Sequence, residues 1–221
     1  MESITPKEMS LIEDRAESMG VSKLLLMENA GAALSREIGK RVPNLEKKRI
    51  VVFAGSGNNG GDAMVCARHL ADRSKIMFYL VKSSESLKTI ESSFNWKILE
   101  KMNDSIDLNQ NNFDKFVQKA ITSIGYGDVI VDGILGTGVK GQLRNPIPAI
   151  IKEINASHAY KVAVDIPTGL DPATGDVSEA CITADLTVTF HRAKTGLLGN
   201  LRETGEIVVV PIGIPPEATG D

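Results

Sequence analysis

A glycine-rich turn at residues 55–62 reads Gly-Ser-Gly-Asn-Asn-Gly-Gly-Asp. Glycine adopts positive φ readily and has no Cβ, so its backbone N–H groups can approach an anion closely. A helix is expected to follow, and its N-terminal dipole favours negative charge. A merely structural turn, with Asn58 and Asn59 left-handed and Asp62 as a helix cap, would not need four glycines. The turn therefore predicts a nucleotide-phosphate site.

The same turn argues against two common nucleotide-binding motifs. It is not a Walker loop, because no Gly-Lys-Ser/Thr follows it. The spacing of Gly55, Gly57 and Gly60 matches Gly-x-Gly-x-x-Gly, which by itself is weak evidence for a dinucleotide fold. An NAD dehydrogenase carries an acidic residue about 20 residues further on, at the end of the next strand. Here that strand reads Phe-Tyr-Leu-Val-Lys at residues 78–82, which disfavours a standard NAD dehydrogenase.

Two aspartates follow apolar runs later in the chain. Asp132 comes after residues 129–131 and precedes a glycine-rich stretch, and Asp165 comes after residues 162–164 and precedes Ile-Pro-Thr-Gly. In open parallel sheets, ligands bind outside the carboxyl ends of the strands. An isolated aspartate at a strand end is usually a cap or turn former. Two of them beside glycine-rich loops instead favour a shared binding site with the turn at 55–62.

The side chains of these loops are rich in oxygen, and amide, carboxylate and hydroxyl oxygens suit a hard cation. No His or Cys cluster has zinc spacing. His69 and His158 are expected to be structural or solvated, and His191, which follows a strand but lacks a nucleophilic Ser or Cys partner, to support the site indirectly. Cys66 and Cys181 indicate buried free thiols, which suits a reducing cytoplasm.

These residues must be positioned by a regular scaffold. Alternating apolar runs and amphipathic segments predict an α/β fold: a Rossmann-like, doubly wound, mostly parallel sheet in a three-layer α/β/α arrangement. A short connection between the last two strands indicates an antiparallel edge. The polar segment 83–112 is expected to contain a helix and a solvated Asn-rich turn. Strands are expected at 50–54, 76–81, 129–131, 162–164, 186–190 and 206–210, and helices at 6–19, 22–42, 63–70 and 146–155.

The bulk composition is that of one globular domain spanning residues 1–221. Hydrophobic residues make up 42% and charged residues 24%, close to the globular average. A net charge of -3 creates no general field for nucleic acid or an anionic membrane. The chain begins without a signal-peptide pattern, and no apolar stretch is long enough for a membrane span. We therefore expect a cytoplasmic protein with neither nucleic acid nor membrane as partner.

Taken together, five motifs in order make the sequence resemble the NAD(P)H-hydrate epimerase family, the YjeF N-terminal domain. Two departures from the family pattern stand out: Ala63 replaces a frequent Gly, and Thr168 replaces a frequent Ser but keeps the hydroxyl. The likeness covers nearly the whole chain and implies a Rossmann-like fold. The motifs are Leu-Met-Glu-Asn-Ala-Gly (26–31), Gly-Asn-Asn-Gly-Gly-Asp (57–62), Val-Asp-Gly-Ile-Leu-Gly-Thr-Gly (131–138), Val-Asp-Ile-Pro-Thr-Gly-Leu-Asp (164–171) and Phe-His-Arg-Ala-Lys-Thr-Gly (190–196).

The resemblance also implies a set of site residues. It implies a bound potassium ion (K+) whose ligands match Asn59, Asp132 and Thr168. We expect Asp165 to be the catalytic acid–base group, with Lys140 assisting electrostatically or simply solvated. The substrate-binding residues implied by the family are Asn58, Asn59, Gly60, Gly61, Asp62, Gly136, Thr137, Gly138, Val139, Lys140, Gly141, Gln142 and Asp165.

The implied activity is metabolite repair by an isomerase. The family interconverts the R and S hydrates of NADH and NADPH (NADHX and NADPHX) at C6 of the nicotinamide ring and feeds a separate dehydratase. Nothing in the sequence matches a dehydratase domain, and the family suggests a homodimer formed through the N-terminal helices. Two alternatives stay open: an NAD-linked oxidoreductase, and a nucleotide-binding or protein-interaction module without turnover.

Overall fold

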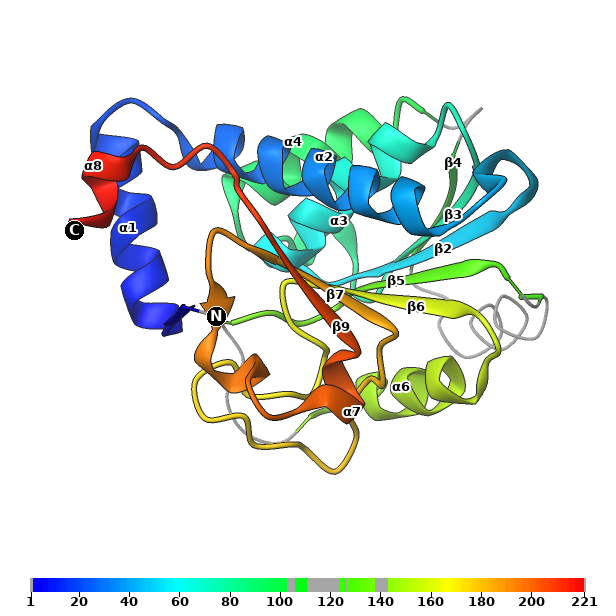
Figure 1. The fold of residues 1–221 in the computed structure, drawn as a ribbon. Helices are drawn as coiled ribbons and strands as arrows, with labels where there is room; N and C mark the ends of the chain where they lie inside the picture. The colour runs from blue at the N-terminus through cyan, green and yellow to red at the C-terminus, as the bar shows by residue number, and fades with distance from the viewer. Residues whose placement is uncertain (1, 103–105, 111–123, 126, 138–142, 221) are drawn as a thin grey trace.

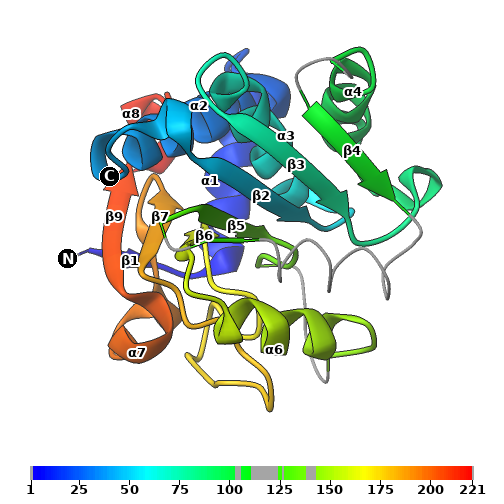
Figure 2. The same ribbon diagram turned by 90° about the vertical axis from the view of Figure 1, so that its right-hand side faces the viewer.

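The structure is a computed structural model that describes residues 2–102, 106–110, 124–125, 127–137 and 143–220. Its centre is a seven-stranded sheet in which every pairing is parallel. The strand order is β4-β3-β2-β5-β6-β7-β9, so the chain starts in the middle, winds to one edge, returns and winds to the other (Figures 1 and 2). This is the doubly wound order expected of a Rossmann-like fold. The predicted fold class is confirmed.

The strands of this sheet are short and mostly apolar, as expected for strands buried on both faces. Alternate residues of β2 point to opposite layers: Val52 belongs to the core under α2 and α3, and Val51 and Phe53 to the core over α6. The strands are β2 Arg49–Ala54, β3 Lys75–Leu80, β4 Ile106–Gln110, β5 Val129–Gly133, β6 Tyr160–Val164, β7 Leu186–Phe190 and β9 Glu206–Val210.

Helices cover both faces of the sheet. Helices α2, α3 and α4 lie on one face and α6 on the other, which gives the three layers (Figure 2). The N-terminal α1 and the C-terminal α8 lie side by side at one end of the sheet (Figure 1). None of the described helices is long and apolar enough to span a membrane. The helices are α1 Pro6–Ser18, α2 Lys23–Arg41, α3 Asn58–Leu70, α4 Ile90–Leu99, α6 Ile147–Ala156, α7 Leu201–Thr204 and α8 Pro216–Thr219.

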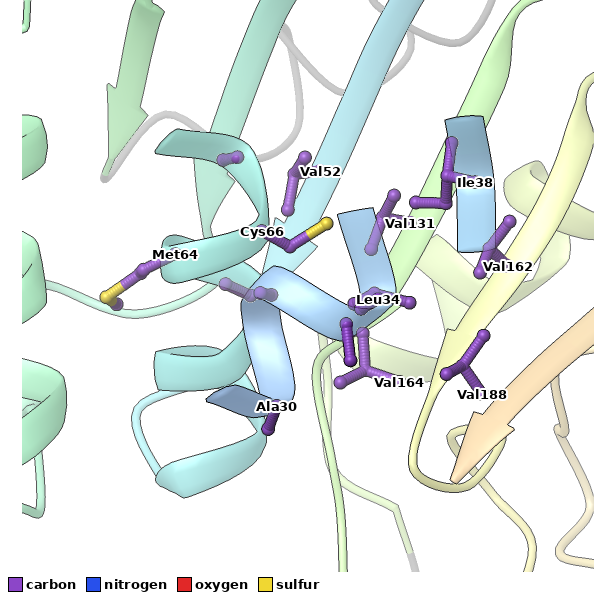
Figure 3. Close-up of a cluster of buried hydrophobic side chains, with 14 of the residues drawn as sticks. Ala30, Leu34, Ile38, Val52, Met64, Cys66, Val131, Val162, Val164 and Val188 are labelled. Carbon is purple, nitrogen blue, oxygen red and sulfur yellow. The ribbon is translucent and has the colours of Figure 1, made fainter. Parts of the chain in front are cut away.

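The core between the sheet and α2 is built from fully buried aliphatic side chains. Leu34 and Ile38 of α2 pack over Val131 and Val162 of the central strands (Figure 3). Gly31 lets α2 approach α3 closely, because a Cβ there would lie 2.4 Å from the Cβ of Val65. This packing holds α3 rigidly in front of the carboxyl ends of the strands.

Two sequence-based expectations were wrong. The last two strands, β7 and β9, pair in parallel rather than antiparallel. The connection between them contains the two-residue β8 (Ala193–Lys194) and helix α7. These elements return the chain to the start of the sheet, so that β9 runs parallel to β7. The segment expected to be a solvated turn contains the strand β4. Only Ile106 and Leu108 are apolar there, which an edge strand with one neighbour tolerates.

Candidate active site

The glycine-rich turn joins β2 directly to α3 at the centre of the sheet. The helix begins at Asn58, earlier than predicted, and its N-cap Gly57 offers no side-chain hydrogen bond. Its first intrahelical donor is Gly61, which donates to the Gly57 carbonyl at 3.1 Å. The N–H groups of Asn58, Asn59 and Gly60 bond to no residue that the structure describes. Three free donors at a helix N-terminus form a site suited to a phosphate.

The reason for the glycines differs from the expected one. None of the four in the turn has positive φ, so conformational freedom does not explain them. A Cβ on Gly55 would lie 1.8 Å from the carbonyl oxygen of Ile134, and one on Gly60 would lie 2.0 Å from the carbonyl oxygen of Gly55. A Cβ on Gly57 would meet no protein atom within 4 Å. Packing therefore requires Gly55 and Gly60, whereas Gly57 leaves open space for a ligand.

The three residues predicted to bind potassium lie in one hydrogen-bonded network. Thr168 donates its backbone N–H to Asp132 Oδ2 at 2.8 Å and its hydroxyl to Asp132 Oδ1 at 2.7 Å. The Leu135 N–H donates to the Thr168 hydroxyl at 3.0 Å, and the Leu135 carbonyl accepts from the Asn59 amide at 3.0 Å. Asp132 and Thr168 are each only 1% exposed. The fold thus brings all three together around the backbone of Leu135.

The donor set of this network fits a weakly hydrated monovalent cation. The Asn59 amide nitrogen is used by Leu135, which leaves its oxygen without a hydrogen bond from any described residue. Burial raises the pKa of Asp132 to about 6, against the opposing effect of its hydrogen bonds, so a nearby cation would compensate its charge. The described residues contain no group of three or more His, Cys, Asp or Glu arranged to hold a metal ion. Carbonyl and hydroxyl oxygens are ligands that potassium accepts.

The second predicted aspartate lies at the end of β6 with left-handed backbone, at φ 62°. Its Oδ1 accepts three hydrogen bonds: from Lys194 Nζ at 2.5 Å, from the Thr189 hydroxyl at 2.9 Å and from the Phe190 N–H at 3.2 Å. Its Oδ2 accepts none from the described residues. Asp165 therefore holds one oxygen fixed and keeps the other free.

Sequence reasoning missed Lys194, the partner of Asp165. Lys194 is only 1% exposed, and its ammonium group also donates to the Phe190 carbonyl at 3.1 Å. The backbone of β8 carries it, and β8 pairs with β1 (Ser3–Ile4) so that Ile4 lies opposite Lys194. The motif Phe-His-Arg-Ala-Lys-Thr-Gly contains Lys194. The residues around it, however, do not indicate that this lysine is buried.

A cavity of about 450 Å³ connects these groups. The N-terminus of α3 and Asp165 with Lys194 line it, together with Glu13 of α1 and Asp62 of α3. Burial raises the pKa of Asp62 well above its usual value, with the charge of Asp165 as the next cause. Burial and Asp165 likewise raise the pKa of Glu13. The cavity therefore combines an anion site with an ion pair and two carboxyl groups that retain protons readily.

The predicted site residues fall into three groups. Those that line the cavity are Asn58, Asn59, Asp62, Gly136, Thr137 and Asp165. Asp132 and Thr168 lie behind the cavity wall, and Gly60 and Gly61 pack against Gly55 and Met27. The predicted residues that lie outside the described part of the chain are Gly138, Val139, Lys140, Gly141 and Gln142.

The histidines and cysteines take no direct part in this cavity. His69 Nε2 lies 2.8 Å from Glu28 Oε1 on the other side of α3, and His158 is exposed. His191 has left-handed backbone, at φ 65°, beside β7 but does not line the cavity. Cys66 is fully buried as predicted, whereas Cys181 is half-buried, and burial raises the pKa of both thiols.

Comparison with known proteins agrees with this geometry. Residues 23–196 match the family model described as YjeF-related protein N-terminus. The chain belongs to this family. The predicted relationship is confirmed, and the YjeF-related match includes the phosphate turn, Asp132, Asp165 and Lys194.

Named relatives of the YjeF-related family include enzymes of two lengths. The NAD(P)H-hydrate epimerases of Nitrosopumilus maritimus and Cenarchaeum symbiosum are 45% and 44% identical, each match covering 97% of both chains. The bifunctional NAD(P)H-hydrate repair enzyme Nnr of Pyrobaculum aerophilum is 45% identical over 99% of this chain and 43% of its own length. The crystal structure of yeast ynu0, YNL200c, superposes with a TM-score of 0.83 at 24% identity, covering 99% of this chain and 92% of that one, and supports the fold.

Proposed function

We propose that this protein is an NAD(P)H-hydrate epimerase, an isomerase that interconverts the R and S forms of NADHX and NADPHX. The observation that carries the proposal is one cavity holding both an anion site at the α3 N-terminus and the buried pair of Asp165 and Lys194. A dinucleotide hydrate needs both features: donors for its pyrophosphate and an acid–base group at its ring. Two relatives of the same length that are named as epimerases support the same activity.

The chemistry requires only proton transfer. When the hydroxyl at C6 is protonated, the C6–O bond breaks, water leaves, and the ring nitrogen lone pair forms a C6=N1 double bond. Water then adds to the opposite face of C6 and loses a proton, so no net oxidation occurs. We assign the proton transfers to Asp165: in its protonated form the free Oδ2 gives a proton to the departing hydroxyl, becomes a carboxylate as water leaves, and regains a proton from the water that adds, while Lys194 and Thr189 hold Oδ1. The carboxylate also stabilises the positive charge that develops on the ring.

A potassium ion is part of the proposal. Asn59, Asp132 and Thr168 would hold it, and its charge would stabilise the loop that follows Asp132. The hydrogen bond from the Leu135 N–H to the Thr168 hydroxyl positions the backbone of Leu135 and Gly136 along the cavity. Lys140 lies outside the described residues, so its electrostatic role stays a prediction.

The proposal extends to partners. Longer relatives are named bifunctional NAD(P)H-hydrate repair enzymes, and we expect the S hydrate formed here to pass to a dehydratase. A homodimer through the N-terminal helices is the other expectation. The exposed side chains of Leu11, Met19 and Leu25, at 49%, 48% and 53%, give this end of the molecule an apolar surface that a second copy would cover. Sedimentation at several concentrations tests the dimer.

The decisive experiment is relaxation of the diastereomer ratio. A sample enriched in R-NADHX or R-NADPHX is incubated with the protein, and the R and S forms are separated by chromatography over time. We expect the ratio to relax to equilibrium faster than in a protein-free control. Tight binding without faster relaxation would reject the proposal in favour of a nucleotide-binding module. A stoichiometric redox change with an added alcohol or carbonyl substrate would instead indicate an oxidoreductase.

A further inference from the structure

The strand order orients the substrate in the cavity. In a Rossmann fold the turn after the first central strand holds the pyrophosphate, and the residue after the neighbouring second strand reads the adenosine ribose. An acidic side chain there bonds the ribose 2′-hydroxyl of NAD, and a cationic one accommodates the 2′-phosphate of NADP. In this chain β2 is the first strand and β3 the second, with Ala54 opposite Leu80. The ribose-reading position therefore falls just after Leu80.

Two lysines occupy this position. Lys82 follows β3 by two residues, Lys88 ends the short loop that comes next, and both line the cavity. The loop is held against the phosphate turn, because the Lys88 N–H donates to the Ser56 carbonyl at 2.8 Å and the Val81 N–H to the Ala54 carbonyl at 2.9 Å. The backbone that carries the two lysines is thus fixed beside the pyrophosphate site.

Their charge is not compensated locally. Both side chains are exposed, and neither forms an ion pair with any residue in the described ranges. Glu91 of α4 also lines the cavity but pairs with neither lysine. By contrast, Lys194 at the other end is neutralised by Asp165. Among the described residues that line the cavity, unpaired positive charge therefore lies at the β3 end, where the ribose is expected.

The two ends of the cavity fit the two ends of one molecule. The N-terminus of α3 lies between them, and the acid–base pair lies toward β6 and β7. With the pyrophosphate at α3 and the hydrated ring at Asp165, the adenosine is directed to β3. The same orientation follows independently from the strand order, so the lysines face the ribose and not the reacting ring.

We propose that Lys82 and Lys88 bind the 2′-phosphate of the adenosine ribose and make NADPHX the preferred substrate over NADHX. The part of this inference that concerns substrate preference in turnover rests on the proposed epimerase function. Each lysine donates a charged hydrogen bond to a phosphate oxygen, an interaction that NADHX, with only a 2′-hydroxyl, cannot match.

The kinetic test compares kcat/KM for R-NADPHX and R-NADHX, with an S-specific dehydratase in excess so that epimerisation limits the rate. Lys82→Ala and Lys88→Ala should each lower kcat/KM for NADPHX roughly tenfold, the loss expected for one charged hydrogen bond, and leave NADHX within about twofold. Lys82→Glu should reverse the preference. Lys97→Ala, an exposed lysine of α4 outside the cavity, is the matched control and should change neither.

A binding test separates this inference from the epimerase activity. Calorimetry measures the affinity for 2′,5′-ADP (adenosine 2′,5′-bisphosphate) and for 5′-AMP, which differ only in the 2′-phosphate and contain no reacting ring. Wild type should prefer 2′,5′-ADP, and the Lys82→Ala/Lys88→Ala double variant should not. If neither hydrate is epimerised but this preference is present, the proposed activity fails and the phosphate site stands. Equal affinity for the two nucleotides in wild type, or an unchanged preference in the double variant, overturns the inference.

Discussion

Lys194 Nζ lies 2.5 Å from Asp165 Oδ1 in a nearly dry environment, with side-chain exposures of 2% and 12%. The lysine comes from β8, which is held by the N-terminal strand β1, and the aspartate from the end of β6. Segments from the beginning, middle and end of the chain thus converge on one carboxylate. The convergence orients the free Oδ2 of Asp165 in a way that no single loop provides.

The first prediction concerns Asp165 itself. Asp165→Asn keeps the shape of the side chain but removes the group that accepts and returns the proton. We expect kcat to fall by about 10²- to 10⁴-fold, the usual contribution of a general acid–base residue. The assay is R-hydrate consumption coupled to an excess of dehydratase. Near-full activity in a variant with an unchanged circular dichroism spectrum would rule out the assignment, and Asp62 would be tested next.

The second prediction concerns the energy of the pair. Lys194→Met leaves the carboxylate buried without its counter-charge, so the free energy of unfolding should fall by about 3–5 kcal/mol. Combining it with Asp165→Asn removes the uncompensated charge. The double variant should therefore be more stable than the sum of the two single losses predicts. Urea unfolding of the four proteins measures this coupling, and strictly additive losses would show that the two residues do not interact energetically.

The third prediction separates glycines needed for packing from those needed for the ligand. Gly60→Ala places a Cβ 2.0 Å from a backbone oxygen, so it should destabilise the fold by about 1–3 kcal/mol or more. Gly57→Ala places its Cβ in open space and should leave stability almost unchanged. It should nevertheless weaken binding of 5′-ADP, measured by calorimetry, because the methyl group occupies the phosphate side of the turn. Equal binding by Gly57→Ala and wild type would contradict a phosphate at that turn.

Much of this site is readable from sequence because its parts lie directly after strands. The turn at β2, Asp132 and Asp165 were found that way, since continuous apolar runs followed by glycine or aspartate mark the carboxyl ends of buried parallel strands. Lys194 was missed because its burial results from β8 pairing with the distant N-terminus. The edge strand β4 was missed because a strand with one neighbour does not need an apolar run. Long-range pairing leaves no local pattern to detect.

The fourth prediction tests the cation site without an activity assay. Potassium chloride should raise the melting temperature relative to choline chloride at equal ionic strength, by about 2–4 °C for each kcal/mol of binding energy. Thr168→Ser keeps the hydroxyl and should keep the effect, whereas Thr168→Val removes a donor to Asp132 and should abolish it. Differential scanning calorimetry provides the measurement. An equal melting temperature of wild type in both salts would reject a potassium site.

The fifth prediction concerns Asp62, whose pKa is raised by burial and by the neighbouring charge of Asp165. Above the ordinary aspartate pKa of about 3.9, the unfolded chain has lost this proton while the folded protein keeps it. The folded state then binds more protons, so the contribution of Asp62 to stability falls as pH rises, until the folded-state pKa is passed.

The variant Asp62→Asn has no proton to lose at this position and escapes that penalty. Its stability relative to wild type should therefore increase in urea unfolding experiments as the pH rises above the ordinary aspartate pKa, and level off once the folded-state pKa is passed. Asp72→Asn, which removes the exposed carboxylate of a residue just after α3, controls for the change in net charge. A difference between Asp62→Asn and wild type that is constant with pH would mean that Asp62 ionises equally in both states. Asp62 would then not be a carboxyl group that retains its proton in the folded protein.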